Sequence, residues 1–66
     1  MTTDEQVAYA WGKTSYLLGI PCSFVLDVDF VAWTKGKAGQ RDLNRQWVNG
    51  WHRAAQIHRE ALPAVA

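Results

Sequence analysis

The stretch Leu43-Asn44-Arg45-Gln46-Trp47-Val48-Asn49-Gly50-Trp51-His52-Arg53-Ala54 decides the fold of this chain. Trp47 and Trp51 are four residues apart, so in a helix they lie on one face. Gly50 stands beside them, although glycine inside a helix costs roughly 1 kcal/mol relative to alanine. A glycine in this place indicates that another helix crosses here and needs the space of the missing side chain. We therefore expect Trp47, Trp51 and Ala54 to form core rather than surface.

The helix that contains this stretch is expected to start near Gln40 or Asp42 and to end at Pro63. Its buried face should consist of Leu43, Trp47, Gly50 or Trp51, Ala54, Ile57 or His58, and Ala61 or Leu62.

An earlier helix is expected from Thr3, the proposed N-cap in a capping box with Gln6, to about Leu18. Gly19 should stop it, because glycine readily adopts the left-handed conformation that ends helices. Gly12 is a second candidate for close backbone approach. The residues at helical spacing that should form the buried face are Val7, Trp11, Thr14 or Ser15, and Leu18.

The connection between the two helices is expected to contain a short helix from Phe30 to about Lys35, capped by Asp27 or Asp29. The sequence thus predicts one all-α domain over residues 1–66. Its predicted architecture is an antiparallel helical hairpin with a short additional helix or irregular insert in the connection. In this arrangement the large side chain of Trp11 should fill the space left by the missing side chain of Gly50, which we call the notch.

Composition limits the setting in which the chain works. The single cysteine, Cys22, excludes an intramolecular disulfide and is typical of a reducing cytosol. No apolar run is long enough for a membrane span, and the first residues are polar and acidic, so we expect a soluble, cytoplasmic protein that does not enter membranes. The chain contains four Trp, two Tyr and two Phe, which carry more apolar surface than 66 residues readily bury. A homodimer could cover part of this surface.

The near-neutral net charge of +1 hides an asymmetry. Residues 1–29 contain four acidic residues and one basic residue, whereas residues 30–59 contain six basic residues and one acidic residue. Such a basic half can bind phosphates or an acidic protein, or can simply face solvent. An aromatic side chain nearby could stack on a base. The candidate RNA- or partner-binding residues are Trp33, Lys35, Lys37, Arg41, Arg45 and Arg53.

Several of these residues resemble a known family. Ala8-x-x-x-Gly12, Gly19, Pro21-Cys22-Ser23-Phe24 and Arg45-x-Trp47-x-x-Gly50-Trp51-x-x-Ala54 are similar to the pattern of ribosome modulation factor and its relatives. The resemblance implies two antiparallel helices. The residues that would define this fold are Gly12, Gly19, Trp47, Gly50, Trp51 and Ala54. Trp11 joins them as a fold-defining residue because its spacing on the first helix predicts a core position.

The resemblance also implies a function. Members that bind the ribosome dock on the small subunit during hibernation, so a non-enzymatic protein that binds ribosomal RNA and modulates translation is expected. Small relatives are common in phages and mobile elements, and the alternative is therefore a phage- or plasmid-encoded adaptor or inhibitor of a host protein. A remote alternative is phosphoryl transfer to an antibiotic, which has been proposed for some relatives.

Catalytic motifs are not recognisable in the sequence. Gly12-Lys13-Thr14 is similar to the end of a phosphate-binding P-loop, but that loop needs a glycine where Val7 stands. It also needs a preceding strand, whereas this tripeptide is expected inside a helix. We therefore predict no catalytic residues and no enzymatic activity.

Metal ligands are equally scarce. His52 and His58 are six residues apart and turn to different sides of a helix, and one cysteine does not make a structural zinc site. Asp27 and Asp29 could bind Mg²⁺, but alternate residues of an extended segment point apart. The sequence therefore predicts no metal and no cofactor.

Overall fold

The structure, a computed structural model, describes residues 1–61, which form helices and turns without strands. Its elements are α1 (Thr3–Leu17), a short 3₁₀ helix η1 (Phe24–Leu26), α2 (Val28–Thr34) and α3 (Gln40–Ala61). The all-α class, the short helix in the connection and the start of the final helix at Gln40 are confirmed. The expectations for Leu62 and Pro63 lie outside the described residues. No helix within the described range is long and apolar enough to cross a membrane.

The N-terminus of α1 is capped one residue earlier than predicted. Thr2 is the N-cap, and its Oγ1 accepts a hydrogen bond from the Glu5 backbone N–H at 3.2 Å. The Glu5 carboxylate accepts one from the Thr2 backbone N–H, also at 3.2 Å, which completes the capping box. Hydrogen bonding of the Glu5 carboxylate to Thr2, above all to its backbone N–H, holds the pKa of Glu5 below its ordinary value. The box therefore joins Thr2 to Glu5 and not Thr3 to Gln6, because the acidic side chain accepts the amide proton better.

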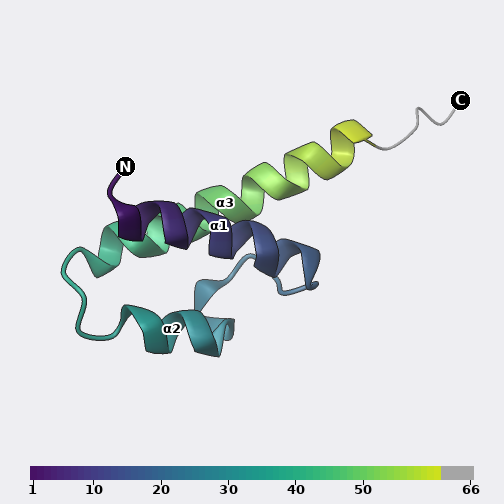
Figure 1. The fold of residues 1–66 in the computed structure, drawn as a ribbon. Helices are drawn as coiled ribbons and strands as arrows, with labels where there is room; N and C mark the ends of the chain where they lie inside the picture. Colours follow the sequence, from purple (N-terminus) through teal and green to yellow (C-terminus); the bar gives the residue numbers. More distant parts are fainter. Residues whose placement is uncertain (62–66) are drawn as a thin grey trace, which may run out of the picture.

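α1 and α3 run in the same direction, so the predicted antiparallel hairpin is wrong (Figure 1). Residues 2–5 and residues 38–43 line one depression at the start of both helices. Residues 13–17 of α1 and residues 54–58 of α3 line another depression further along both. The physical reason lies in the connection, where α2 runs back along the pair and returns the chain to the start of α1 before α3 begins (Figure 1).

Two glycines set the distance between α1 and α3. A Cβ atom added to Gly12 would overlap the Trp47 carbonyl oxygen, and one added to Gly50 would overlap the Tyr9 carbonyl oxygen. Both glycines are buried. The two helices are therefore in backbone contact along what we call the glycine seam, the contact made by Gly12 and Gly50. The close approach predicted at each glycine is confirmed, but the α1 backbone, and not Trp11, fills the notch at Gly50.

The buried face of α1 agrees with the predicted one at Ser15 and differs from it at Val7 and Leu18. It consists of small residues, Ala8, Gly12 and Ser15. Val7 and Leu18, which were expected in the core, are 40% and 72% exposed. Backbone contact with α3 leaves room for only small side chains on α1, so size and not hydrophobicity selects its buried face.

The Asp27 carboxylate links all three α-helices. It caps α2 by accepting a hydrogen bond from the Phe30 backbone N–H at Oδ1, at 3.3 Å. Its Oδ2 atom accepts a 2.6 Å bond from the Ser15 hydroxyl of α1 and a 3.1 Å bond from the Trp47 indole N–H of α3. Asp27 is 6% exposed. The prediction that Asp27 or Asp29 caps the short helix is confirmed for Asp27.

Aromatic rings fill the space between α2 and the other helices. Phe30 and Trp47 are fully buried, with ring centroids 6.1 Å apart. Trp11 packs edge-on against Phe30 at 5.6 Å and lies 5.5 Å from Trp33. The core positions expected for Trp11 and Trp47 are thus confirmed, Trp11 being half-buried. Because the fully buried residues of α1 are small, the fully buried aromatic side chains, Phe30 and Trp47, come from α2 and α3.

The remaining fold-defining residues also have structural roles. The half-buried Trp51 packs edge-on against Tyr16 at 5.1 Å and donates its indole N–H to the Ile20 carbonyl at 2.7 Å. Gly19, with φ of 81°, ends α1 as predicted. Ala54 is buried on α3.

The glycine seam predicts that Gly→Ala substitutions lower the free energy of unfolding, whereas helix propensity alone predicts that they raise it. Alanine stabilises a helix interior by about 1 kcal/mol relative to glycine. A Cβ at Gly50 would meet backbone, which cannot rotate aside, and overpacking typically costs about 1–3 kcal/mol or more. We expect Gly12→Ala and Gly50→Ala each to lower the free energy of unfolding by about 2 kcal/mol, measured by urea denaturation followed by circular dichroism. Asn49→Ala, at an exposed position of α3, is the control and should be neutral or stabilising. Stabilisation by Gly50→Ala would contradict the seam.

The Asp27 contacts make a second prediction. In Asp27→Asn, the amide NH₂ would face either the two donors on Oδ2 or the Phe30 N–H, and the bonds that remain would lose their charge. Hydrogen bonds to charged groups contribute about 1.5–3 kcal/mol, so we expect a loss of about 2 kcal/mol in unfolding free energy. Asp29→Asn removes the same charge from an exposed position two residues away and serves as the control, with little expected effect. Equal losses in the two variants would show that the charge matters and the buried hydrogen bonds do not.

Candidate nucleic-acid interface

The face of α3 opposite the glycine seam is basic. In an α-helix successive residues turn by about 100°, so positions 41, 45, 52 and 59 lie within about 40° of one another. These positions are Arg41, Arg45, His52 and Arg59, and all four are exposed. The acidic residues of α3, Asp42 and Glu60, lie off this row. We call the four residues the basic row.

A shallow groove accompanies the first half of the basic row. It runs between η1 and α3, and the residues that line it are Phe24, Gln40, Arg41, Asn44, Arg45 and Val48. Phe24 packs edge-on against the buried Trp47, with ring centroids 6.5 Å apart, and this contact holds η1 against α3. The groove thus combines two guanidinium groups and two side-chain amides with an apolar wall, all on a rigid helix.

The arginines of this face are free to bind an external anion. Within residues 1–61 the ion pair found is the one between Lys37 and Asp4, with Nζ 3.7 Å from Oδ2. Arg41 and Arg45 therefore have no carboxylate partner in the part of the chain that the structure describes. Guanidinium groups form bidentate hydrogen bonds to phosphate and carboxylate, and an exposed pair one helical turn apart can contact neighbouring phosphates.

Trp33 and Lys37 contact each other and not the groove. The Lys37 ammonium lies over the Trp33 ring, 4.7 Å from its centroid, in a cation–π contact. Trp33 itself is half-buried beside Trp11 and Phe30. The sequence-predicted pair is therefore brought together, but it ties the end of α2 to the start of α1 through the ion pair of Lys37 with Asp4.

The other two sequence-predicted residues lie apart from the groove. Lys35 is exposed at the C-terminal end of α2. Arg53 is exposed on α3 but turned by roughly 80–120° from Arg41 and Arg45, and it donates a 3.2 Å hydrogen bond to Gln56. The structure thus brings Arg41 and Arg45 together and leaves Lys35 and Arg53 on other parts of the surface.

Several groove residues were not identified from the sequence. Gln40 and Asn44 are polar residues that precede and follow Arg41, and projecting the final helix as a wheel would have placed them beside the arginines. Phe24 and Val48 give no such signal, because their position depends on how η1 packs against α3. His52 gives a sequence signal, since its spacing of seven residues from Arg45 places it on the basic row.

The side chains that could act as catalytic groups or metal ligands mostly contact other protein groups. His52 Nε2 lies 3.5 Å from Cys22 Sγ, and His58 Nδ1 lies within hydrogen-bond distance of the Tyr16 hydroxyl. Partial desolvation raises the pKa of the Cys22 thiol, which favours its neutral form. Both oxygens of Asp27 accept hydrogen bonds from protein groups. Among residues 1–61 no three His, Cys, Asp or Glu side chains cluster in a way that could hold a metal ion.

Comparisons of the chain with protein-family models, with characterised proteins and with solved structures gave no match.

Proposed function

We propose that this protein binds RNA without catalysing a reaction, and that it does so through Arg41, Arg45 and the groove beside them. The observation that carries the proposal is the pair of exposed arginines on one face of α3, without carboxylate partners among residues 1–61 and next to the amide side chains of Gln40 and Asn44. Nucleic acids are polyanions in which phosphates recur at regular short spacing, and two arginines one helical turn apart can contact neighbouring phosphates.

The geometry favours contacts to the nucleic-acid backbone. Arginine contacts to phosphate give affinity that is independent of sequence and falls with salt. Gln40 and Asn44 can each donate and accept hydrogen bonds, which suits ribose hydroxyls and phosphate oxygens. His52 and Arg59 continue the basic row beyond the groove, so an RNA backbone can follow α3 over several helical turns.

The sequence pattern shared with ribosome modulation factor, noted above on residues of both long helices, supports ribosomal RNA of the small subunit as the target. The support is from the sequence alone, because the antiparallel helices that the resemblance implied are not found (Figure 1). On this proposal the protein occupies a surface of the ribosome and modulates translation in the cytoplasm. Binding alone would produce the effect, since occupying a functional surface excludes other ligands.

A second candidate is an adaptor or inhibitor that binds a protein, as expected for a phage- or plasmid-encoded relative. One observation favours it, namely that several apolar side chains around the end of α1 and the start of α2 are more than half exposed. They are Leu17, Leu18, Val25, Leu26 and Val28. Exposed apolar patches of this kind often contact proteins.

The RNA proposal predicts the effect of removing single charges. With a fluorescently labelled 20-base-pair RNA duplex as the probe, Arg41→Gln and Arg45→Gln should each weaken binding about five-fold, and the double variant more than ten-fold, as measured by anisotropy. If each arginine contacts a phosphate, each substitution should also reduce the slope of log K against log salt by about 0.7–0.9.

Lys35→Gln is the matched control, because it removes one positive charge from an exposed position at the C-terminal end of α2, away from the groove. It should change affinity and salt slope little. If Lys35→Gln weakens binding as much as Arg45→Gln, only net charge matters, and the groove proposal is wrong.

Gradient sedimentation of a cell lysate that contains the tagged protein separates the two candidate functions. Migration with small ribosomal subunits at low salt, lost in the double arginine variant, is the expected result. Absence from ribosomal fractions together with capture of a host protein would favour the adaptor.

A further inference from the structure

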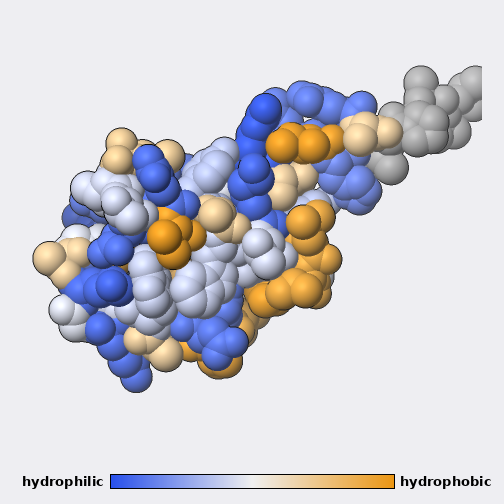
Figure 2. Space-filling view, in the orientation of Figure 1, coloured by the Kyte–Doolittle hydropathy of each residue, from blue (hydrophilic) through white to orange (hydrophobic). Residues whose placement is uncertain are grey.

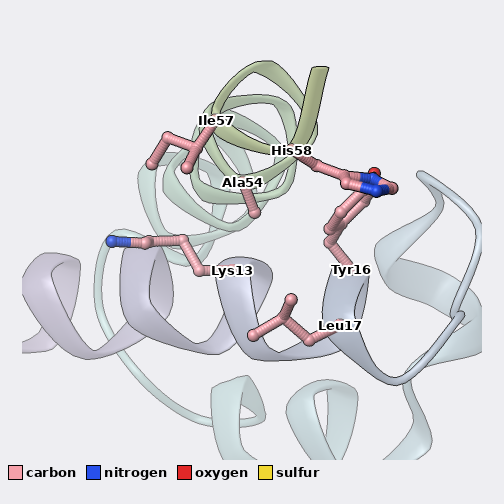
Figure 3. Close-up of a pocket in the computed structure, with 6 residues that line it drawn as sticks. All are labelled: Lys13, Tyr16, Leu17, Ala54, Ile57 and His58. Carbon is pink, nitrogen blue, oxygen red and sulfur yellow. The ribbon is translucent and has the colours of Figure 1, made fainter. Parts of the chain in front are cut away.

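A second surface of the molecule is an apolar depression between the ends of α1 and α3. Lys13, Tyr16 and Leu17 of α1 and Ala54, Ile57 and His58 of α3 line it. In Figure 3, Ala54 points towards α1, Tyr16 meets His58 on one side, and Lys13 and Ile57 lie on the other side. Figure 2 shows apolar surface over the end of α1 and over the second half of α3, with a hollow between them. Leu17 is 78% exposed and Ile57 is 42% exposed.

The depression exists because α3 is longer than its partners. α1 ends at Leu17, whereas α3 continues to Ala61 and extends beyond the rest of the described structure (Figure 1). Ile57 and Ala61, four residues apart on one side of α3, are therefore left uncovered by α1. Every copy of the chain therefore carries both the exposed Ile57 and Ala61 on the projecting helix and the depression at its base, so two copies related by a two-fold axis can cover these surfaces reciprocally.

Charge also favours a second copy as the occupant. Lys13 lies on the Ile57 side of the depression (Figure 3). Its ammonium lies over the Tyr9 ring, 5.8 Å from the centroid. Glu60 follows Ile57 by three residues on the same side of α3, and its carboxylate accepts a 3.2 Å hydrogen bond from Gln56. Neither Lys13 nor Glu60 takes part in an ion pair within residues 1–61.

We propose that this surface binds a second copy of the chain, with the two α3 helices crossing antiparallel near Ile57 about a two-fold axis. In an antiparallel crossing at residue 57, Glu60 of one copy lies level with Ala54 of the other, where Lys13 is found. Ile57 of each copy then covers Leu17 of the other, and two symmetric Lys13–Glu60 pairs border the apolar contact. The basic row lies on another side of α3, about 120° or more from Ile57, and stays exposed on both copies.

Sedimentation equilibrium of the full chain tests the proposal. The contact is small, so the expected result is a monomer–dimer equilibrium with a dissociation constant on the order of micromolar to hundreds of micromolar. Ile57→Glu should raise that constant at least ten-fold. Val28→Glu makes the same change at an apolar position that is 73% exposed but lies outside the surface, and it should leave the constant unchanged. Circular dichroism verifies that both variants fold.

A charge exchange tests the orientation. Lys13→Glu and Glu60→Lys should each weaken the dimer several-fold, because each places like charges together. The double variant should recover the dissociation constant of the original chain within about two-fold, since it restores opposite charges. A monomer at all concentrations, a dimer unaffected by Ile57→Glu, or a double variant as weak as the two single ones would each overturn the proposal.

Discussion

The structure depends on the backbone contact between α1 and α3 at Gly12 and Gly50. Each glycine lies where a Cβ would overlap a carbonyl oxygen of the other helix, so the two helices can come this close only without side chains there. The consequence is that α1 buries small residues and contributes little apolar volume. Trp47, the largest fully buried side chain, comes from α3, and it needs a further element to cover it. That element is α2.

Asp27 explains why α2 takes its position. A buried carboxylate is costly unless it is hydrogen-bonded, and Asp27 accepts bonds from Ser15, Phe30 and Trp47, which lie on three different helices. These hydrogen bonds therefore fix the position of α2 relative to Ser15 of α1 and Trp47 of α3. With α1 and the aromatic residues of α2 packed on one side of α3, its opposite side remains exposed. Arg41 and Arg45 lie on that side.

Much of the fold was predictable from the sequence, because its signals are local. Gly19 ends α1, Asp27 caps α2, and the spacing of Trp47 and Gly50 identifies the contact face of α3. The direction of packing was not predictable, since periodicity defines which face of a helix is buried but not which way a neighbouring helix runs. A connection of sufficient length allows either direction. The buried face of α1 was predicted only in part: Trp11 and Ser15 were expected there, whereas Ala8 was not, because size and not hydrophobicity selects the residues in contact with α3. Of the candidate site, Arg41 and Arg45 could be predicted as a pair by their spacing, whereas the cation–π contact of Lys37 with Trp33 depends on tertiary packing.

Folding and binding use opposite sides of α3, and an NMR titration tests this division most directly. Amide and side-chain signals would be followed while the 20-base-pair RNA duplex is added to the isotopically labelled protein. We expect the largest shifts at Arg41, Asn44 and Arg45, extending towards Arg59, while Gly12 and the Trp47 indole N–H change little. Shifts confined to the apolar surface around Leu17 and Val25, or no shifts at saturating RNA, would contradict this division.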